Sequence, residues 1–217
     1  MTGPAEQHSR AVPGGGARLV APSAARNLAP ICDLLAEVAP AQGTALELAS
    51  GTGQHVVALA ARLPGLIWQP TEIDPERRAS ISAWLDEAGL PNTRPPLALD
   101  ACAPGWGRDH GGQALVFLSN LLHLISTPRA ETLIDEAALA LAPGGRLVIY
   151  GPFMRAGDLT SDGDRAFHAS LIAHDPDIGY KDDFDIMDII QAAGLEMVRV
   201  VEMPANNLGL VAHRPDG

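Results

Sequence analysis

The sequence predicts a single α/β domain built on a doubly wound, mostly parallel sheet with one antiparallel strand. Short apolar segments alternate with amphipathic segments along most of the chain, which predicts right-handed strand–helix–strand crossovers. The last two apolar segments are joined only by "PANN" (204–207). A link this short permits only an antiparallel pair, because a parallel return needs a dozen residues or more. We therefore expect seven strands, one of them reversed near an edge of the sheet.

Length and composition narrow the classes of protein. A chain of 217 residues suffices for one domain with a sizeable core. Residues 1–18 are rich in Gly and Pro and lack periodicity, so we expect a mobile tail there and one domain over residues 19–217. No apolar run is long enough to cross a bilayer and no secretory signal is recognisable. We therefore expect a cytoplasmic protein without a membrane partner, either a monomer or a homodimer.

Charge and cysteine content exclude further partners. The formal net charge is -11, and Lys and Arg do not cluster, so a nucleic-acid partner is not expected and a small molecule is favoured. The two cysteines have no CxxC spacing, and the seven histidines form no pair at zinc spacing. The sequence thus indicates neither a disulfide framework nor a metal site.

The individual elements follow from periodicity and from capping residues. Apolar residues at helical spacing predict a first helix over residues 27–38, with Pro30 in its first turn. A later helix is expected to start at Asp74 as N-cap, with Pro75 in the first position, and to end at Gly89. The predicted strands cover residues 44–49, 66–72, 96–100, 114–119, 146–150, 195–203 and 208–214, and the remaining helices cover residues 54–63, 127–141 and 184–193. A loop-rich insertion is expected at about residues 151–182.

The segment "ALELASGTGQH" (45–55) places a glycine-rich turn directly after the first predicted strand. A dinucleotide-binding turn needs a third glycine where this chain has Val56, and no Gly-Lys-Ser/Thr follows, as a nucleotide hydrolase would require. Glu47 precedes the turn, where a carboxylate repels a pyrophosphate but suits a ligand with a positive charge. The turn is therefore predicted to hold something other than phosphate.

The stretch "LELASGTGQH" resembles the first motif of class I S-adenosylmethionine (SAM)-dependent methyltransferases, at Glu47, Ala49, Gly51 and Gly53. The family usually has glycine in place of Ala49; alanine fits if its φ is negative and otherwise strains the turn. The resemblance extends from about residue 23 to residue 214. More narrowly, "APSAARNLAPI", "SGTGQH", "WQPTEIDP", "YGPF" and "MPANN" look like a small methyltransferase-like family whose substrates are mostly unknown. It implies a Rossmann-like fold, SAM as cofactor and S-adenosylhomocysteine (SAH) as product.

The resemblance and the strand ends together indicate a cofactor site. Backbone amides of the turn would meet the SAM carboxylate, and Glu47 would attract its ammonium directly or through water. Glu72 lies 21 positions after Gly51, close to the offset of a ribose-binding acid, although Asp74 competes for this role. The resemblance implies that Asp100 accepts a hydrogen bond from the adenine amino group. The alternative is that Asp100 is only a turn residue. The expected cofactor residues are Arg26, Asn27, Glu47, Ala49, Gly51, Gly53, Glu72, Ile73, Asp100, Ala101, Ser119 and Asn120. Arg26 and Asn27 could instead only begin a helix.

Methyl transfer from SAM is an in-line displacement, so alignment of the acceptor dominates the catalysis. His123 is the candidate general base, or else a packed ring in a helical turn, and Tyr150 could line the acceptor pocket or bond an acceptor atom. The remaining expected pocket residues are Phe153, Arg155, His168, Asn206 and Asn207. The end of the fourth predicted strand has no Asn-Pro-Pro-Tyr segment, which disfavours N-methylation of adenine or glutamine, and no acidic residue to bind magnesium for a catechol-like acceptor. The chain also lacks the Pro-Cys segment of cytosine methylases.

The expected activity is therefore methyl transfer to oxygen or nitrogen of a small molecule. Two alternatives remain at the level of sequence. One is a SAM-binding sensor or partner module without turnover, and the other is an NAD-dependent oxidoreductase, which Glu47 and Val56 disfavour.

Overall fold

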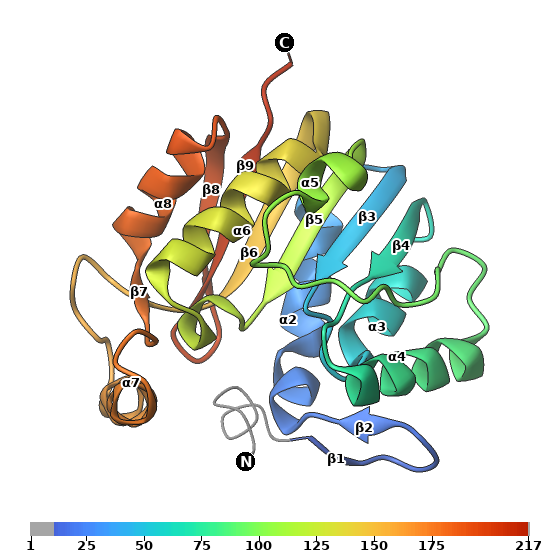
Figure 1. The fold of residues 1–217 in the computed structure, drawn as a ribbon, viewed down its shortest axis with the longest axis horizontal. Helices are drawn as coiled ribbons and strands as arrows, with labels where there is room; N and C mark the ends of the chain where they lie inside the picture. The colour runs from blue at the N-terminus through green and yellow to red at the C-terminus, as the bar shows by residue number, and fades with distance from the viewer. Residues whose placement is uncertain (1–10, 217) are drawn as a thin grey trace.

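The computed structural model describes residues 11–216 and shows a central twisted sheet with helices on both faces (Figure 1). The strands of the large sheet are β3 (Gly43–Leu48), β4 (Leu66–Pro70), β5 (Gln113–Ser119), β6 (Leu141–Met154), β7 (Lys181–Asp182), β8 (Glu196–Met203) and β9 (Asn207–His213). The helices are α2 (Pro22–Val38), α3 (Gln54–Arg62), α4 (Pro75–Ala88), α5 (Trp106–Asp109), α6 (Thr127–Ala140), α7 (Asp162–His174) and α8 (Asp183–Ala192), with the 3-10 turn η1 at Leu122–Leu124. The predicted doubly wound α/β class is confirmed.

The strand order is β4-β3-β5-β6-β9-β8, with β7 beside β6, which gives the expected seven strands. Strands β3, β4, β5 and β6 pair in parallel, and β9 is antiparallel to both of its neighbours. The single reversed strand is therefore confirmed. The chain leaves β3 for β4 on one side and later returns as β5 on the other. This reversal creates a crevice at the carboxyl ends of β3 and β5, where such sheets bind ligands.

Alternation along the strands fills two core layers. On β3, Leu46 and Leu48 pack with α6 and α8, whereas Ala45 packs with α2, α3 and α4. Successive side chains of a strand point to opposite faces, so Glu47 lies on the α2–α3 side. Both faces of the sheet are covered, which explains why β3 and β5 are apolar almost throughout.

The predicted third strand at residues 96–100 is wrong. This segment meets the sheet only in a single bridge, from Leu97 to Thr71, and a second isolated bridge joins Thr93, before the segment, to Trp68. Pro95 and Pro96 have no backbone N–H to donate to a ladder, which explains why continuous pairing fails here. The two-residue strand β7 in the insertion supplies the seventh strand instead.

The N-terminal segment differs in part from the mobile tail expected over residues 1–18. Residues 1–10 lie outside the described residues, but β1 (Val12–Pro13) and β2 (Leu19–Val20) form an antiparallel hairpin. Arg18 forms an ion pair with Glu87 and lies 4.9 Å from the centre of the Trp84 ring. These contacts dock the hairpin on α4 across more than 60 residues of sequence, which periodicity alone could not reveal.

Helix α2 also begins earlier than expected, at Pro22 in place of residue 27. Pro22 suits the first turn of a helix, because the amide that it lacks would have no partner there. Pro30 consequently lies inside the helix, where it cannot donate to the carbonyl of Arg26. In contrast, Asp74 caps α4 as predicted by accepting from the amides of Glu76 and Arg77, at 2.7 and 3.4 Å.

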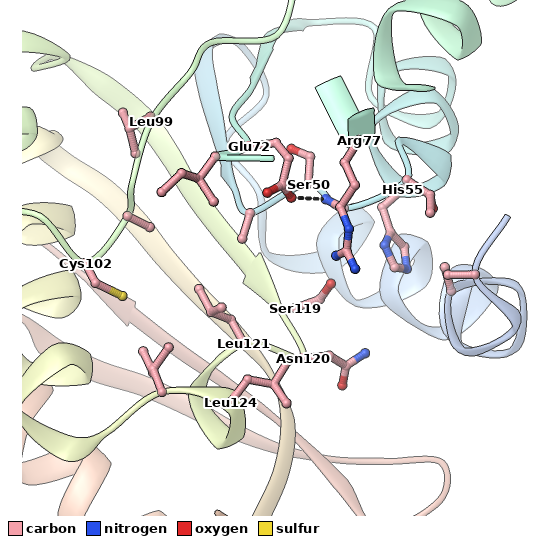
Figure 2. A pocket seen from close by; sticks show the side chains of 18 of the residues that line it. Ser50, His55, Glu72, Arg77, Leu99, Cys102, Ser119, Asn120, Leu121 and Leu124 are labelled. Atoms are coloured by element: carbon pink, nitrogen blue, oxygen red, sulfur yellow. Dashed lines mark hydrogen bonds between the residues drawn. The ribbon is translucent and has the colours of Figure 1, made fainter. Parts of the chain in front are cut away.

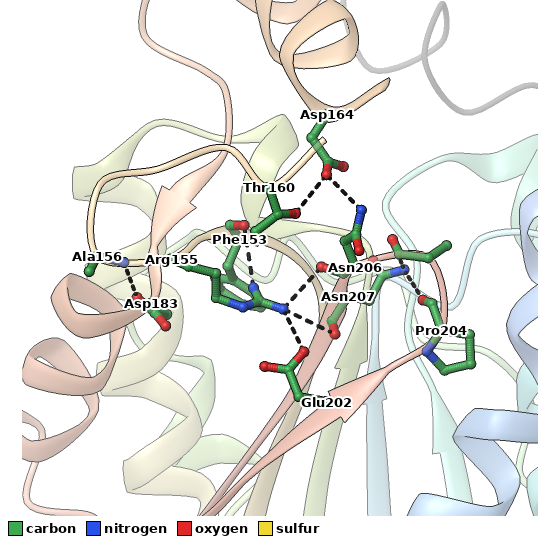
Figure 3. A network of polar contacts seen from close by, with 11 residues as sticks. Phe153, Arg155, Ala156, Thr160, Asp164, Asp183, Glu202, Pro204, Asn206 and Asn207 are labelled. Atoms are coloured by element: carbon green, nitrogen blue, oxygen red, sulfur yellow. Dashed lines mark hydrogen bonds and ion pairs between the residues drawn. The ribbon is translucent and has the colours of Figure 1, made fainter. Parts of the chain in front are cut away.

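The insertion at residues 151–182 contains α7 and β7 and is held by two polar centres (Figure 3). Arg155 donates to Glu202 and to the carbonyls of Asn206 and Asn207, at 3.2, 3.2 and 3.4 Å. Asp164 accepts from four groups: the hydroxyls of Thr160, Ser161 and Tyr180 and the amide of Asn206. The insertion is therefore fixed to the β8–β9 turn rather than being a loose loop. Within residues 11–216, no helix is long and apolar enough to cross a membrane.

Candidate functional site

Two adjoining cavities lie at the carboxyl edge of the sheet. The first, of about 470 Å³, is bounded by the ends of β3, β4 and β5, and Figure 2 shows its lining. The second, of about 720 Å³, lies between α2, η1, α7 and the β8–β9 turn. Ser23, Asn120 and Leu124 line both cavities, so a ligand in one would meet a ligand in the other at these residues.

The glycine turn forms one wall of the first cavity. Gly51 has a φ of 58°, and a Cβ there would meet nothing within 4 Å, so bare backbone faces open space. Gly53 has a φ of 96°, and its Cβ would lie 2.9 Å from the Cα of Ile81. This contact requires glycine, because α3 and α4 pack tightly at this point. The amides of Gly51 and Gly53 donate to Glu72 and to the Ser50 carbonyl, so the donors that an anionic group needs would come from the first amides of α3.

Ala49 has a φ of 50°, so the strained alternative raised by the sequence is the one that the turn adopts. An L-residue in this region costs about 1–2 kcal/mol. We expect Ala49→Gly to stabilise the protein by up to about 1 kcal/mol, because glycine relieves the strain but loses more entropy on folding. Ala58→Gly, inside α3, is the matched control and should destabilise by about 1 kcal/mol. Thermal unfolding measures both changes, and equal losses of stability would contradict a strained Ala49.

Glu47 does not line the first cavity, contrary to the expectation that it faces a ligand directly. Its side chain is 2% exposed, and its Oε2 atom has no hydrogen-bond partner among residues 11–216. Burial raises the pKa of Glu47 to about 8; a hydrogen bond from Ser50 opposes the rise, and the charge of Glu72 adds to it. Glu47 stands two residues before Ala49 in the chain, and a cation bound near this buried carboxyl would favour its ionised form.

Glu72, the expected ribose-binding acid, lines the first cavity. Its Oε2 accepts from the amide of Gly51 at 3.0 Å, and its Oε1 accepts from the amide of Asp74 at 3.1 Å. These bonds hold both carboxylate oxygens at the cavity wall and leave further lone pairs. Because Asp74 caps α4, it is Glu72 that is available to a ligand.

Asp100 lines the same cavity at its other end, and Ala101 lies beside it. Its carboxylate accepts from the amide of Cys102 at 2.9 Å and from Arg129 at 3.2 and 3.3 Å. Ile73, Ser119 and Asn120, which were also expected at the cofactor site, line this cavity too. Sequence reasoning missed Arg129, because it lies 29 residues downstream on α6 and only the fold brings it to Asp100.

Arg77 and His55 also line the first cavity and were not predicted (Figure 2). Arg77 comes from the first turn of α4 and lies 3.9 Å from Asp74. His55 is 7% exposed, and burial lowers its pKa to about 4, so its ring is neutral at pH 7. The histidine of "SGTGQH" was the available signal, but one buried histidine on a helix ordinarily indicates packing.

His55 belongs to a chain of polar contacts that joins the two cavities. Its Nε2 lies 2.9 Å from Oδ1 of Asn27, which can only accept, so Nε2 carries the proton. The side chain of Asn27 also forms a hydrogen bond with Tyr150. Burial raises the pKa of Tyr150, and this hydrogen bond offsets part of the rise. The net rise keeps the Tyr150 hydroxyl protonated at neutral pH. Arg26 and Asn27 line the second cavity, not the first.

Aromatic rings form much of the second cavity. His123, in η1, is 7% exposed and lies edge-on to Phe167 and Tyr180, with ring centres 5.7 and 6.1 Å away. Tyr150, Pro152 and Asn207 contribute to the same lining. The two residues predicted to act on an acceptor, His123 and Tyr150, therefore face one cavity.

Four expected pocket residues lie elsewhere. Phe153 is 2% exposed and packs in the core with α6 and α8. Arg155 and Asn206 hold the insertion to the β8–β9 turn, as described above, and His168 accepts from the amide of Tyr180 at 3.0 Å. None of these four residues lines either cavity.

A comparison with models of known protein families shows which family the chain belongs to. A family described as "Protein of unknown function (DUF938)" matches residues 18–214. The chain belongs to this family. The sequence motifs resemble those of a small methyltransferase-like family whose substrates are mostly unknown. That resemblance extends from about residue 23 to residue 214, and the family match covers nearly the same residues.

Solved structures share the fold of this DUF938 protein. An O-methyltransferase family protein from Burkholderia thailandensis has a TM-score of 0.76 at 21% identity, over 90% of this chain and 58% of that one. A putative O-methyltransferase from Nostoc punctiforme PCC 73102 has a TM-score of 0.76 at 19% identity, over 88% and 56%. A structure described as "PigF with SAH" has a TM-score of 0.73 at 17% identity, over 88% and 56%. The chain thus spans little more than half the length of these proteins, and such low identity establishes a common fold alone.

Proposed function

We propose that this DUF938 protein is a SAM-dependent methyltransferase that transfers a methyl group to oxygen or nitrogen of a small molecule. The observation that carries the proposal is the junction of the two cavities. The first cavity gathers the glycine turn, Glu72 and Asp100 at the strand switch point, and it meets the second cavity at Asn120. A cofactor and an acceptor could be brought into contact there, which is the main requirement for an in-line transfer.

The residues in and behind the first cavity match the polar parts of SAM. The first amides of α3 would hold the carboxylate, and Glu47, buried outside the cavity lining, would balance the ammonium once a bound cation favours its ionised form. Glu72 would accept from the ribose hydroxyls, and Asp100 from the adenine amino group. The fold shared with proteins described as O-methyltransferases, and with the structure described as "PigF with SAH", supports this assignment.

SAM supplies an activated methyl group on a sulfonium, so the protein has to orient the acceptor, exclude water and move at most one proton. His123 is the proposed base for an acceptor proton, because its ring lies at the second cavity between two aromatic walls. Tyr150 stays protonated and is oriented by Asn27, so it would donate to an acceptor oxygen rather than remove a proton. We further expect residues 19–217 to act as one cytoplasmic domain.

Ligand-dependent unfolding tests the proposal. At a hundred times the dissociation constant, a ligand of the folded state adds about 2.7 kcal/mol, which corresponds to a rise in Tm of roughly 5–10 °C for a domain of this size. SAM and SAH should both produce such a rise, whereas NAD should not. Stabilisation by NAD alone would favour an oxidoreductase. Stabilisation by SAM without methyl transfer to any compound of a cell extract would favour a sensor or partner module.

Two variants separate the roles in the second cavity. With a labelled acceptor identified from an extract, His123→Ala should lower kcat by about 100-fold or more if His123 is the base. Tyr150→Phe should lower kcat by about 10-fold, because it removes one hydrogen bond to the acceptor. SAH binding should be unchanged in both variants. Unchanged rates in both would mean that alignment alone drives the transfer.

A further inference from the structure

The two cavities differ in charge. Glu72, Asp100, Arg77 and Arg129 line the first cavity, so both signs are present there. Among residues 11–216, the second cavity is lined by no Asp or Glu, and Arg26 is its one Lys or Arg. This is notable in a chain with 26 acidic residues and a net charge of -11. An anion in the second cavity would therefore meet the Arg26 guanidinium and no carboxylate of the lining itself; Asp164, behind Tyr180, already accepts from four groups.

Arg26 is available to a ligand. Of the arginines that line the cavities, Arg77 lies near Asp74 and Arg129 pairs with Asp100. Arg26 is exposed on α2, and its guanidinium has no hydrogen bond or ion pair with any of the described residues 11–216. A guanidinium presents a flat fork of donors that matches the two oxygens of a carboxylate.

The walls beside Arg26 favour a flat ring. His123, Phe167 and Tyr180 meet edge to face, with Phe167 and Tyr180 at 6.0 Å between ring centres. Tyr180 is fixed because its hydroxyl donates to Asp164 at 3.1 Å, and Asp164 is itself held by Ser161, the N-cap of α7, which accepts from the Asp164 amide and donates to its carboxylate. A rigid aromatic wall gives apolar contact and ring-to-ring geometry to an aromatic ligand.

A second positive charge lies next to this wall in the chain. Lys181 follows Tyr180 and is 8% exposed; its Nζ donates to the carbonyls of Ile125 and Gly179 at 2.8 and 3.0 Å. No carboxylate among the described residues pairs with it at ion-pair distance. This ammonium adds to the positive field near the aromatic wall.

We propose that the second cavity binds a small aromatic carboxylate as the methyl acceptor, with its ring against His123, Phe167 and Tyr180 and its carboxylate on Arg26. The inference rests on the proposed function for the word acceptor, but the binding that it predicts can be measured separately. Arg26 is then the residue that determines specificity for charge.

Matched probes test this inference in the full-length protein saturated with SAH. Calorimetric titration compares 4-hydroxycinnamate with its neutral amide, 4-hydroxycinnamamide, which has the same ring and length. We expect the carboxylate to bind at least about 10-fold more tightly, the contribution of roughly one charge-assisted pair. Arg26→Met should abolish this preference, whereas Arg62→Met, an exposed arginine on α3 outside both cavities, should retain it.

The outcomes distinguish the two proposals. Three outcomes would overturn the inference: equal binding of acid and amide, a preference that survives in Arg26→Met, or no binding of either probe at millimolar concentration. In each case, binding of SAH would leave the proposed function intact. If SAH itself fails to bind, the proposed function fails. The same titrations without SAH then decide whether the cavity selects an aromatic carboxylate.

Discussion

Glu72→Ala is expected to weaken SAH binding by about 100-fold, because hydrogen bonds between a carboxylate and two hydroxyls contribute about 1.5–3 kcal/mol each at most. Glu72 is 5% exposed and is held at the cavity wall by the amides of Gly51 and Asp74. A carboxylate positioned in advance loses little entropy when a ribose binds. Isothermal titration calorimetry with SAH measures the change directly.

The same bonds to the backbone mean that Glu72→Ala could also loosen the glycine turn. Glu72→Gln addresses this, because it keeps the shape and one acceptor oxygen, and should weaken SAH by a smaller factor of about 10. Glu76→Gln removes an exposed charge from the first turn of α4, outside the cavity, and should leave the affinity unchanged. Equal affinity in wild type and Glu72→Ala would exclude Glu72 from the ribose site.

Glu47→Gln is expected to remove most of a pH-dependent loss of stability in the ligand-free protein. Burial raises the pKa of Glu47 from its ordinary value of 4.5 to about 8. Below pH 4.5 the carboxyl is neutral in the folded and unfolded states, so its ionisation costs no stability. Between pH 4.5 and about 8 the unfolded chain ionises first, and stability falls as pH rises. Each unit of pKa difference between the folded and the unfolded state corresponds to about 1.4 kcal/mol, so the loss in free energy of unfolding is at most several kcal/mol.

Denaturant unfolding from pH 5 to pH 9 measures this effect as a difference in slope between wild type and variant. The glutamine adds a buried amide of its own, so the slopes are informative and the absolute stabilities are less so. Glu37→Gln, on the exposed part of α2, is a control that should not change the slope. Parallel curves for wild type and Glu47→Gln would show that Glu47 is not a buried carboxyl with a raised pKa.

The sequence predicted those parts of the fold that depend on local chemistry. Asp74, Pro75 and Gly89 define α4 through capping and backbone preference within a few residues, and the structure retains all three. The short "PANN" link likewise required an antiparallel pair, now β8 and β9. The strand expected at residues 96–100 failed because pairing depends on partner strands, and proline removes donors that an apolar pattern does not count.

The candidate site was predictable at strand ends and less so elsewhere. Glu72, Asp100 and Asn120 follow strands or strand-like segments, so the sheet itself brings them together. Arg77, Arg129 and His55 come from helices, and their approach depends on how those helices pack. Phe153 was misplaced because an apolar residue after a strand fits a pocket wall and a core position equally well.

The most direct test of the central claim is a crystal structure of the protein grown with SAH. We expect SAH in the first cavity, with its ribose hydroxyls on Glu72, its adenine beside Asp100 and its sulfur facing the second cavity near Asn120. SAH bound outside this cavity, or a first cavity that stays empty at saturating SAH, would contradict the assignment of the site.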